Sequence, residues 1–114
     1  MRERLYILFF FSCTLLISSC LKNEIANGTP RCIQKKIREF NKDAMCDDAR
    51  VDEYQFQGGV VYVFEDSSCM MDGGSVVYSD NCDRIGFLGR ISGNFEINGE
   101  TFEHAVFSRE IWHK

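Results

Sequence analysis

Residues 51–64, with the sequence VDEYQFQGGVVYVF, decide the fold of this chain. Beta-branched and aromatic residues stand on both sides of the segment Gln57-Gly58-Gly59, and their spacing changes to a period of two from Val51 onward. Two such runs around a Gly-rich turn are typical of a β-hairpin. We therefore predict two antiparallel strands, the second of them over residues 60–64.

Three more strands and a small hairpin are predicted towards the C-terminus. Residues 75–79 and 84–88 each follow a turn rich in Asp, Asn or Gly. Asn98-Gly99 is the dipeptide that most strongly favours a two-residue hairpin turn, and apolar residues flank it within residues 95–102. The alternating tail, residues 105–112, is expected to form the last strand.

A single helix is predicted before the strands. Its apolar side chains recur at helical spacing on one face: Ile33, Ile37, Phe40 and Ala44. Thr29 can serve as the N-cap and Pro30 as the first helical residue, so we place the helix over residues 30–41. The expected fold class is therefore α+β, with one N-terminal helix packed on an antiparallel sheet of four to six strands. The sheet face away from the helix is expected to be partly exposed to water.

The length and composition fit one small domain. The chain has 114 residues, of which 45% are hydrophobic and 26% are charged, and it contains one Pro and nine Gly. This composition supports a packed core and excludes a disordered or proline-rich chain. The formal net charge of −4 argues against nucleic acid as a partner. We expect a monomer.

The first 19 residues have the pattern of a signal peptide. A basic start precedes an apolar run over residues 5–17, whose 13 residues are too few for a transmembrane helix of about 20 residues. The sequence Ile17-Ser18-Ser19-Cys20 resembles a bacterial lipobox. That resemblance implies cleavage before Cys20 and acylation of its thiol, which anchors the protein in a membrane. An ordinary secretory signal with an accidental cysteine is the alternative.

The cleavage site that the lipobox implies also gives the expected boundaries of the segments of the chain. Residues 1–19 would be the lipoprotein signal peptide, residues 20–29 the lipidated cysteine with a flexible tether, and residues 30–114 the single α+β domain. Leu21 follows Cys20, at the position where an Asp would favour retention in the inner membrane. By this resemblance we expect an outer-membrane lipoprotein of the cell envelope, facing either the periplasm or the exterior.

Four cysteines remain in the mature chain besides Cys20: Cys32, Cys46, Cys69 and Cys82. An even number in a small exported domain predicts two disulfides. The predicted helix separates Cys32 from Cys46, which disfavours a bridge between these two. Two pairings stay open, 32–69 with 46–82 and 32–82 with 46–69, and we favour the first. Close pairs typical of a zinc site are missing, so we expect no metal and no cofactor.

Charge is divided unevenly along the mature chain. The predicted helix carries five basic residues against the single acid Glu39: Arg31, Lys35, Lys36, Arg38 and Lys42. Residues 31–42 therefore have a charge of +4, whereas the mature chain has 11 basic and 16 acidic side chains, a net charge of −5. The basic helix face is either simply solvated or a patch that binds an anionic surface.

The sequence contains no P-loop, no G-x-S-x-G and no G-x-G-x-x-G that opens a helix. We therefore expect a non-enzymatic envelope lipoprotein that binds an unknown envelope macromolecule. One form of this hypothesis is an inhibitor that inserts an exposed loop, residues 67–74 or 89–93, into the cleft of a hydrolase. The alternative is a small hydrolase or ligand-binding protein that uses carboxylates or His104.

Several short motifs are shared with a known family. They are Cys32-Ile33 at the start of the helix, the strand of residues 60–64, the stretch VYSDNC of residues 77–82 with Ile85 after it, and Ile111-Trp112 near the end. Together they resemble an uncharacterised domain family found in small lipoproteins of Bacteroidota. The resemblance covers residues 31–112 and implies the envelope compartment and the fold. The family has no assigned activity, so the resemblance implies no reaction.

Overall fold

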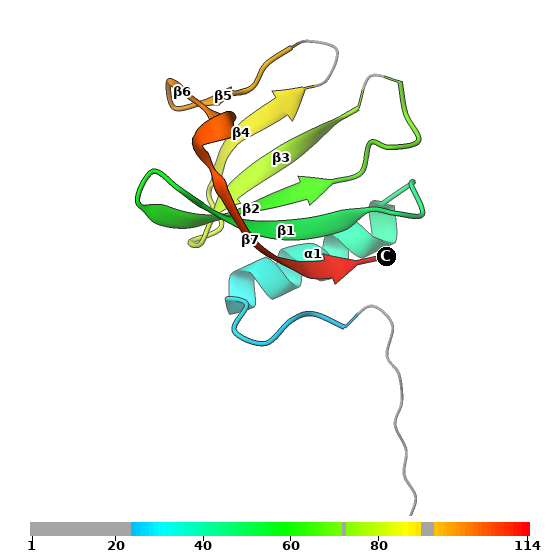
Figure 1. Ribbon diagram of the computed structural model, residues 1–114. Helices are drawn as coiled ribbons and strands as arrows, with labels where there is room; N and C mark the ends of the chain where they lie inside the picture. The colour runs from blue at the N-terminus through cyan, green and yellow to red at the C-terminus, as the bar shows by residue number, and fades with distance from the viewer. Residues whose placement is uncertain (1–23, 72, 90–92) are drawn as a thin grey trace, which may run out of the picture.

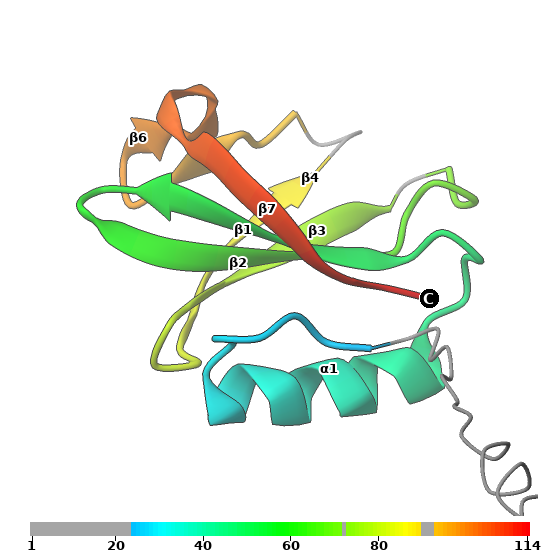
Figure 2. The ribbon, with the colours of Figure 1, turned by 60° about the horizontal axis from the view of Figure 1, so that its bottom comes forward.

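The computed structural model describes residues 24–71, 73–89 and 93–114 (Figure 1). Within these residues the elements are α1 (Arg31–Asp43), β1 (Arg50–Phe56), β2 (Gly59–Glu65), β3 (Gly74–Ser79), β4 (Arg84–Gly89), β5 (Glu96–Ile97), β6 (Glu100–Thr101), the 3₁₀ helix η2 (Phe102–His104) and β7 (Val106–His113). Five strands form an antiparallel sheet in the order β4-β3-β2-β1-β7, and β5 pairs with β6 in a separate hairpin. Figure 2 shows α1 along one face of the sheet. The predicted α+β fold is confirmed.

Both predicted hairpins are present. Phe56 pairs with Gly59, so the turn between β1 and β2 consists of only Gln57 and Gly58. These two residues have φ angles of 55° and 78°, and a type I′ turn requires such positive values at both positions. The Asn98-Gly99 turn between β5 and β6 repeats this geometry, with φ angles of 52° and 82°.

The central strand β2 is buried on both faces. Residues 61–64 are all buried, and successive side chains of a strand point to opposite faces of the sheet. Tyr62 and Phe64 therefore face α1, where they share a buried core with Ile33 and Ile37. The ring of Phe40 in α1 meets the ring of Phe64 edge-on, with 5.2 Å between the ring centroids. The apolar side of α1 thus covers one face of the sheet, as predicted.

The opposite face is partly exposed to water, as predicted, but its centre is buried. A second cluster is buried there: Phe56, Val61, Val63, Val77 and Ile97. Ile97 belongs to the β5–β6 hairpin, which lies over this face together with η2 (Figures 1 and 2). Gly86 in β4 leaves room for Ile97, because a Cβ atom at position 86 would collide with the Ile97 side chain. The local pattern predicts the hairpin, but it does not show where the hairpin packs.

The start of α1 differs from the prediction. The helix spans Arg31–Asp43 instead of residues 30–41, and Pro30 precedes it as the N-cap residue. The backbone N–H of Gln34 donates to the carbonyl of Pro30 at 2.9 Å. Thr29 does not cap the helix, because its hydroxyl donates to the carbonyl of Ala26 at 2.8 Å. The predicted capping role of Thr29 is therefore wrong.

Residues 24–29 belong to the packed domain, so the prediction of a flexible tether over residues 20–29 is wrong for this part. The backbone N–H of Ala26 donates to the carbonyl of Ile111 in β7 at 2.9 Å, and Ala26 packs against the core under α1. We call residues 24–29 the entry segment, and Figure 2 shows it beside α1. The predicted signal peptide and the rest of the tether lie outside the described residues.

Two disulfides connect the α1 region to the two ends of β3, and they correct the favoured pairing. Cys32 at the start of α1 bonds to Cys82, which follows β3, and their Cα atoms are 6.1 Å apart. Cys46 lies beyond the end of α1 and bonds to Cys69, which precedes β3, at a Cα distance of 5.5 Å. The favoured pairing of 32–69 with 46–82 is therefore wrong, and the other open pairing is present.

The lengths and directions of α1 and β3 explain this pairing. The 13 residues of α1 and the 6 residues of β3 both span about 20 Å. Each end of the helix can therefore be bridged to one end of the strand. Which ends meet depends on the direction of α1 relative to β3, and local sequence patterns do not specify that direction.

Removing either disulfide should destabilise the domain. Loop-closure entropy gives about 4 kcal/mol for the separation of 50 residues between Cys32 and Cys82, and about 3 kcal/mol for the 23 residues between Cys46 and Cys69. We therefore expect the Cys32→Ala/Cys82→Ala variant to unfold at a lower urea concentration than the Cys46→Ala/Cys69→Ala variant. If both variants were as stable as the unchanged protein, the assigned bridges would be incorrect.

The core on the face opposite α1 should also contribute to stability. Ile97 is only 1% exposed, so truncation to Ala leaves a cavity that costs about 2–4 kcal/mol. Phe95 in the same region is 53% exposed, and Phe95→Ala should cost less than about 0.5 kcal/mol. Urea unfolding of both variants measures the difference. Similar losses for the two variants would show that the β5–β6 hairpin does not pack on the sheet as described.

Candidate functional site

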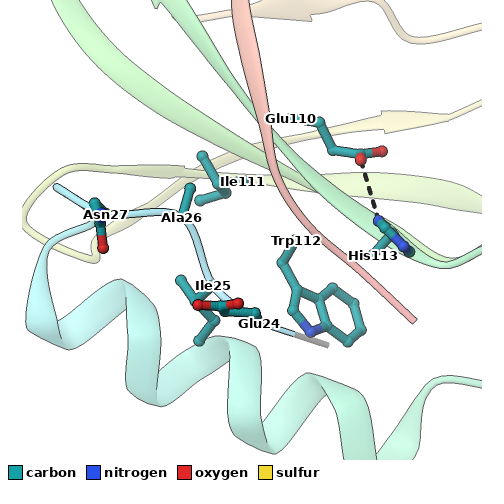
Figure 3. A pocket seen from close by; sticks show the side chains of 8 residues that line it. All are labelled: Glu24, Ile25, Ala26, Asn27, Glu110, Ile111, Trp112 and His113. Atoms are coloured by element: carbon teal, nitrogen blue, oxygen red, sulfur yellow. Dashed lines mark hydrogen bonds and ion pairs between the residues drawn. The ribbon is translucent and has the colours of Figure 1, made fainter. Parts of the chain in front are cut away.

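One hollow lies between the entry segment and the edge strand β7 (Figure 3). It has a volume of about 330 Å³ and is lined by residues of these two segments: Glu24, Ile25, Ala26, Asn27, Glu110, Ile111, Trp112 and His113. Trp112 is buried, and its ring meets the ring of Phe40 edge-on at 5.8 Å. Glu110 and His113 are exposed and form an ion pair, with 3.2 Å between Oε1 and Nδ1. This hollow is a seam between two packed segments, and its apolar wall belongs to the core under α1.

A second hollow lies on the sheet face opposite α1, and we call it the aromatic hollow. Its volume is about 280 Å³, and its walls combine aromatic rings, carboxylates, hydroxyl groups and small apolar residues: Tyr54, Phe95, Phe102, Glu65, Glu103, Ser67, Ser75, Val63, Gly74, Leu88 and Gly89. The rings of Tyr54 and Phe102 meet edge-on at 5.2 Å. Burial raises the pKa of Tyr54, and the nearby Asp52 carboxylate adds to this shift. The Tyr54 hydroxyl therefore stays protonated. Such walls can bind a small ligand with an apolar ring and polar substituents.

Exposed apolar side chains surround the same region. Phe95 lines the aromatic hollow and is 53% exposed. Phe107 is 55% exposed, and its ring lies 5.6 Å from the ring of Tyr54. Val106, its neighbour in β7, is also exposed, but it pairs with Gln55 and projects from the other face of the sheet. We refer to Phe95 and Phe107 as the apolar rim. Apolar surface of this kind is typical of sites that contact another molecule.

His104, a candidate catalytic residue, forms a pair with Glu100. The Nδ1 atom of His104 lies 2.8 Å from Oε2 of Glu100, and both side chains are accessible to water. The hydrogen bonds from His104 and then from Gln57 lower the pKa of Glu100. Gln57 and Glu100 stand at the two adjacent hairpin turns, so the cluster ties these turns together. The four-residue spacing between Glu100 and His104 is the one signal in the sequence that could have indicated this pair.

Asp52 is a buried carboxyl on β1. Its Oδ2 atom accepts a hydrogen bond from Nε of Arg50 at 3.0 Å. Burial nevertheless raises the pKa of Asp52, and the attraction of Arg50 only opposes this shift. On the same strand, Glu53 pairs with Arg109 of β7 at 3.1 Å. The pair of Glu53 with Arg109 joins β1 to β7, whereas the pair of Arg50 with Asp52 lies within β1.

The five predicted basic residues of α1 have different surroundings. The ammonium group of Lys36 lies 4.5 Å from the centre of the Tyr78 ring, in a cation–π contact. The other four side chains are exposed: Arg31, Lys35, Arg38 and Lys42. The exposed basic surface of the helix therefore consists of four of the five residues.

The described part of the chain contains neither a cluster of metal ligands nor a free thiol. No group of three or more His, Cys, Asp or Glu side chains in it could hold a metal ion. All four of its cysteines are in disulfides, so none provides a free thiol beside His104. No helix in this part is long and apolar enough to cross a membrane. Cys20, the predicted lipidation site, lies outside the described residues.

Comparison with known proteins identifies a family for most of this fold. Residues 38–114 match the family model described as a domain of unknown function, DUF6970. The match begins within α1 and extends over all the strands of the sheet. It confirms the prediction of an uncharacterised domain family. No curated protein and no solved structure matches the chain.

The buried carboxyl of Asp52 should leave a signature in the pH dependence of stability. Its folded pKa lies above the unfolded value of 3.8, so the folded state binds a proton that the unfolded state has already released. The stability contributed by Asp52 is therefore fully present below pH 3.8 and is lost as the pH rises through the folded pKa. We expect Asp52→Asn to remove this decline in urea unfolding measured from pH 3 upward. Parallel stability curves for the two proteins would contradict the raised pKa.

Proposed function

This chain belongs to the DUF6970 family, and from that premise and from its own residues we propose that it is a non-enzymatic, lipid-anchored protein of the bacterial cell envelope. In this proposal the signal peptide ends at residue 19, Cys20 carries the lipid, and the protein lies at the outer membrane of a member of the Bacteroidota. The folded domain then binds another macromolecule of the envelope.

The pairing of all four cysteines in the described chain is the observation that carries the proposal. Disulfides form and persist in oxidising compartments outside the cytosol. The two bridges stabilise a domain whose cores are small. Export requires a signal at the N-terminus, and Ile17-Ser18-Ser19-Cys20 has the lipobox pattern there. The disulfides and the lipobox thus independently favour the same compartment.

The apolar rim and the aromatic hollow support a binding role. Phe95 and Phe107 are each more than half exposed, although burial of an aromatic side chain is favourable. Contact with a partner would remove this surface from water. In the inhibitor form of the proposal, the exposed Met71 near the β2–β3 connection would also contact the target.

A second candidate function is the binding of a small ligand in the aromatic hollow. The observation that favours it is the presence of Glu65 and Glu103 beside the rings of Tyr54 and Phe102. Such a site would hold the apolar part of a ligand against the rings and its hydroxyl or amino groups against the carboxylates. A hydrolase that uses His104 has less support, because the pair of His104 with Glu100 is exposed.

Intact mass spectrometry of the native protein tests the proposal. We expect a chain that begins at Cys20, carries acyl chains, and gains four hydrogen atoms on reduction, two for each disulfide. Cys20→Ser should keep the disulfides but lose the acyl mass, and the variant should leave the outer-membrane fraction. Because Cys13 lies within the predicted signal peptide, Cys13→Ser is the matched control, which should be processed and lipidated normally. A chain with unmodified Cys20, or four free thiols in the mature domain, would contradict the proposal.

A further inference from the structure

The four exposed cations of α1 form a straight stripe along the helix. Arg31, Lys35, Arg38 and Lys42 follow one another at intervals of four, three and four residues. At about 100° of rotation per residue, their Cα atoms fall within an arc of roughly 60°. The buried residue Ile33 lies on the opposite side of the helix, so the stripe is the part of α1 farthest from the sheet. We call these four residues the basic ridge.

No ion pair in the described part of the chain neutralises the charges of the basic ridge. Among the described residues, ion pairs involve Arg50, Arg109 and the two histidines, and none involves a residue of the ridge. Of the four ridge residues, Arg38 alone has a polar side-chain partner among the described residues, the amide oxygen of Gln34 at 3.5 Å. Of the 16 acidic residues of the mature chain, only Glu39 and Asp43 lie in α1. The outer side of α1 is therefore a local positive surface on an acidic protein, and such a surface attracts fixed negative charge.

The entry segment, which leads to the predicted lipid attachment point, lies on the same side of the molecule as α1. Ala26 is fixed to β7 by its backbone hydrogen bond, and Figure 2 shows that the segment runs beside the helix. Glu24 lines the seam near His113, and the neighbouring Lys114 donates to the carbonyl of Ala44 at the end of α1. The first described residue is thus close to the C-terminal end of the helix.

The link between the lipid and the domain is short. Four Cα–Cα steps separate Cys20 from Glu24, so they can span at most about 14 Å. Electrostatic attraction between exposed charges extends over about 8–10 Å at physiological ionic strength. If Cys20 carries a lipid, the short link therefore holds one end of the basic ridge near the membrane surface. The distance is then close to the range over which charged headgroups attract the ridge. A tether extending to residue 29 would not impose this restriction.

We propose that the basic ridge of α1 lies on the anionic headgroups of the membrane that holds the lipid anchor. The inference rests on the proposed function and specifies how the anchored domain is oriented. The ridge contacts phosphate groups of the bilayer, while the acidic remainder of the domain is repelled from it. The aromatic hollow, on the other side of the sheet, then faces away from the membrane and stays open to a partner.

Binding of the unlipidated mature chain to vesicles tests the ridge apart from the anchor. The probe is the chain from residue 20 to residue 114 with Cys20→Ser, sedimented with phosphatidylglycerol vesicles. We expect binding that weakens as salt is raised and that is absent with phosphatidylcholine vesicles. Lys35→Gln should weaken binding about fivefold, and Lys35→Gln/Arg38→Gln should weaken it by more than tenfold.

Asn98→Asp is the matched control for Lys35→Gln. Each substitution lowers the net charge by one. Asn98, however, lies in the β5–β6 turn on the far side of the sheet from α1. Binding of the Asn98→Asp variant to phosphatidylglycerol vesicles should therefore change less than twofold. Equal losses for the two variants would show a response to net charge alone and would overturn the proposal. Equal binding to neutral vesicles, no binding to phosphatidylglycerol, or binding to soluble heparin without vesicle binding would also overturn it. Since the probe carries no lipid, these outcomes are independent of whether Cys20 is acylated in cells.

Discussion

The burial of β2 on both faces is the constraint on which the rest of the domain depends. Four consecutive apolar side chains, residues 61–64, require an apolar layer above the sheet and another below it. α1 supplies the first layer, and the short β5–β6 hairpin with η2 supplies the second. The two layers differ in size, and the surface features of the domain lie on or beside them. The basic ridge lies on the outside of one layer, and the aromatic hollow lies beside the other.

The disulfides give this arrangement its rigidity. A single helix on a sheet can rotate or slide when only apolar contacts hold it, because such contacts are not directional. Covalent links from Cys32 and Cys46 to opposite ends of β3 restrict both movements. The side of α1 that carries the charges is therefore fixed relative to the sheet. A lipid at one point and an oriented charged surface together limit the rotation of a protein on a bilayer more than either does alone.

The sequence predicts the local elements well because their signals lie within a few residues. The Gln57-Gly58 and Asn98-Gly99 turns need positive φ angles, and the apolar period of α1 identifies its buried side. Local patterns do not specify features that depend on distant contacts: which of the two open disulfide pairings forms, and the packing of Ile97 on the sheet. The candidate sites likewise include features with a local sequence signal and features that distant residues form together. The helix cations are visible as a run of charge, but the contact of Lys36 with Tyr78 and the walls of the aromatic hollow come from residues far apart in the chain.

The hydrogen bond from Ala26 to Ile111 has a consequence for association of the protein with itself. β7 is an edge strand, and an edge strand presents unpaired backbone groups that can pair with a strand of another chain. The entry segment covers part of that edge near the C-terminus of β7. Resistance to aggregation thus depends in part on six residues that precede the helix, and a chain shortened past Ala26 would present a longer free edge to its neighbours.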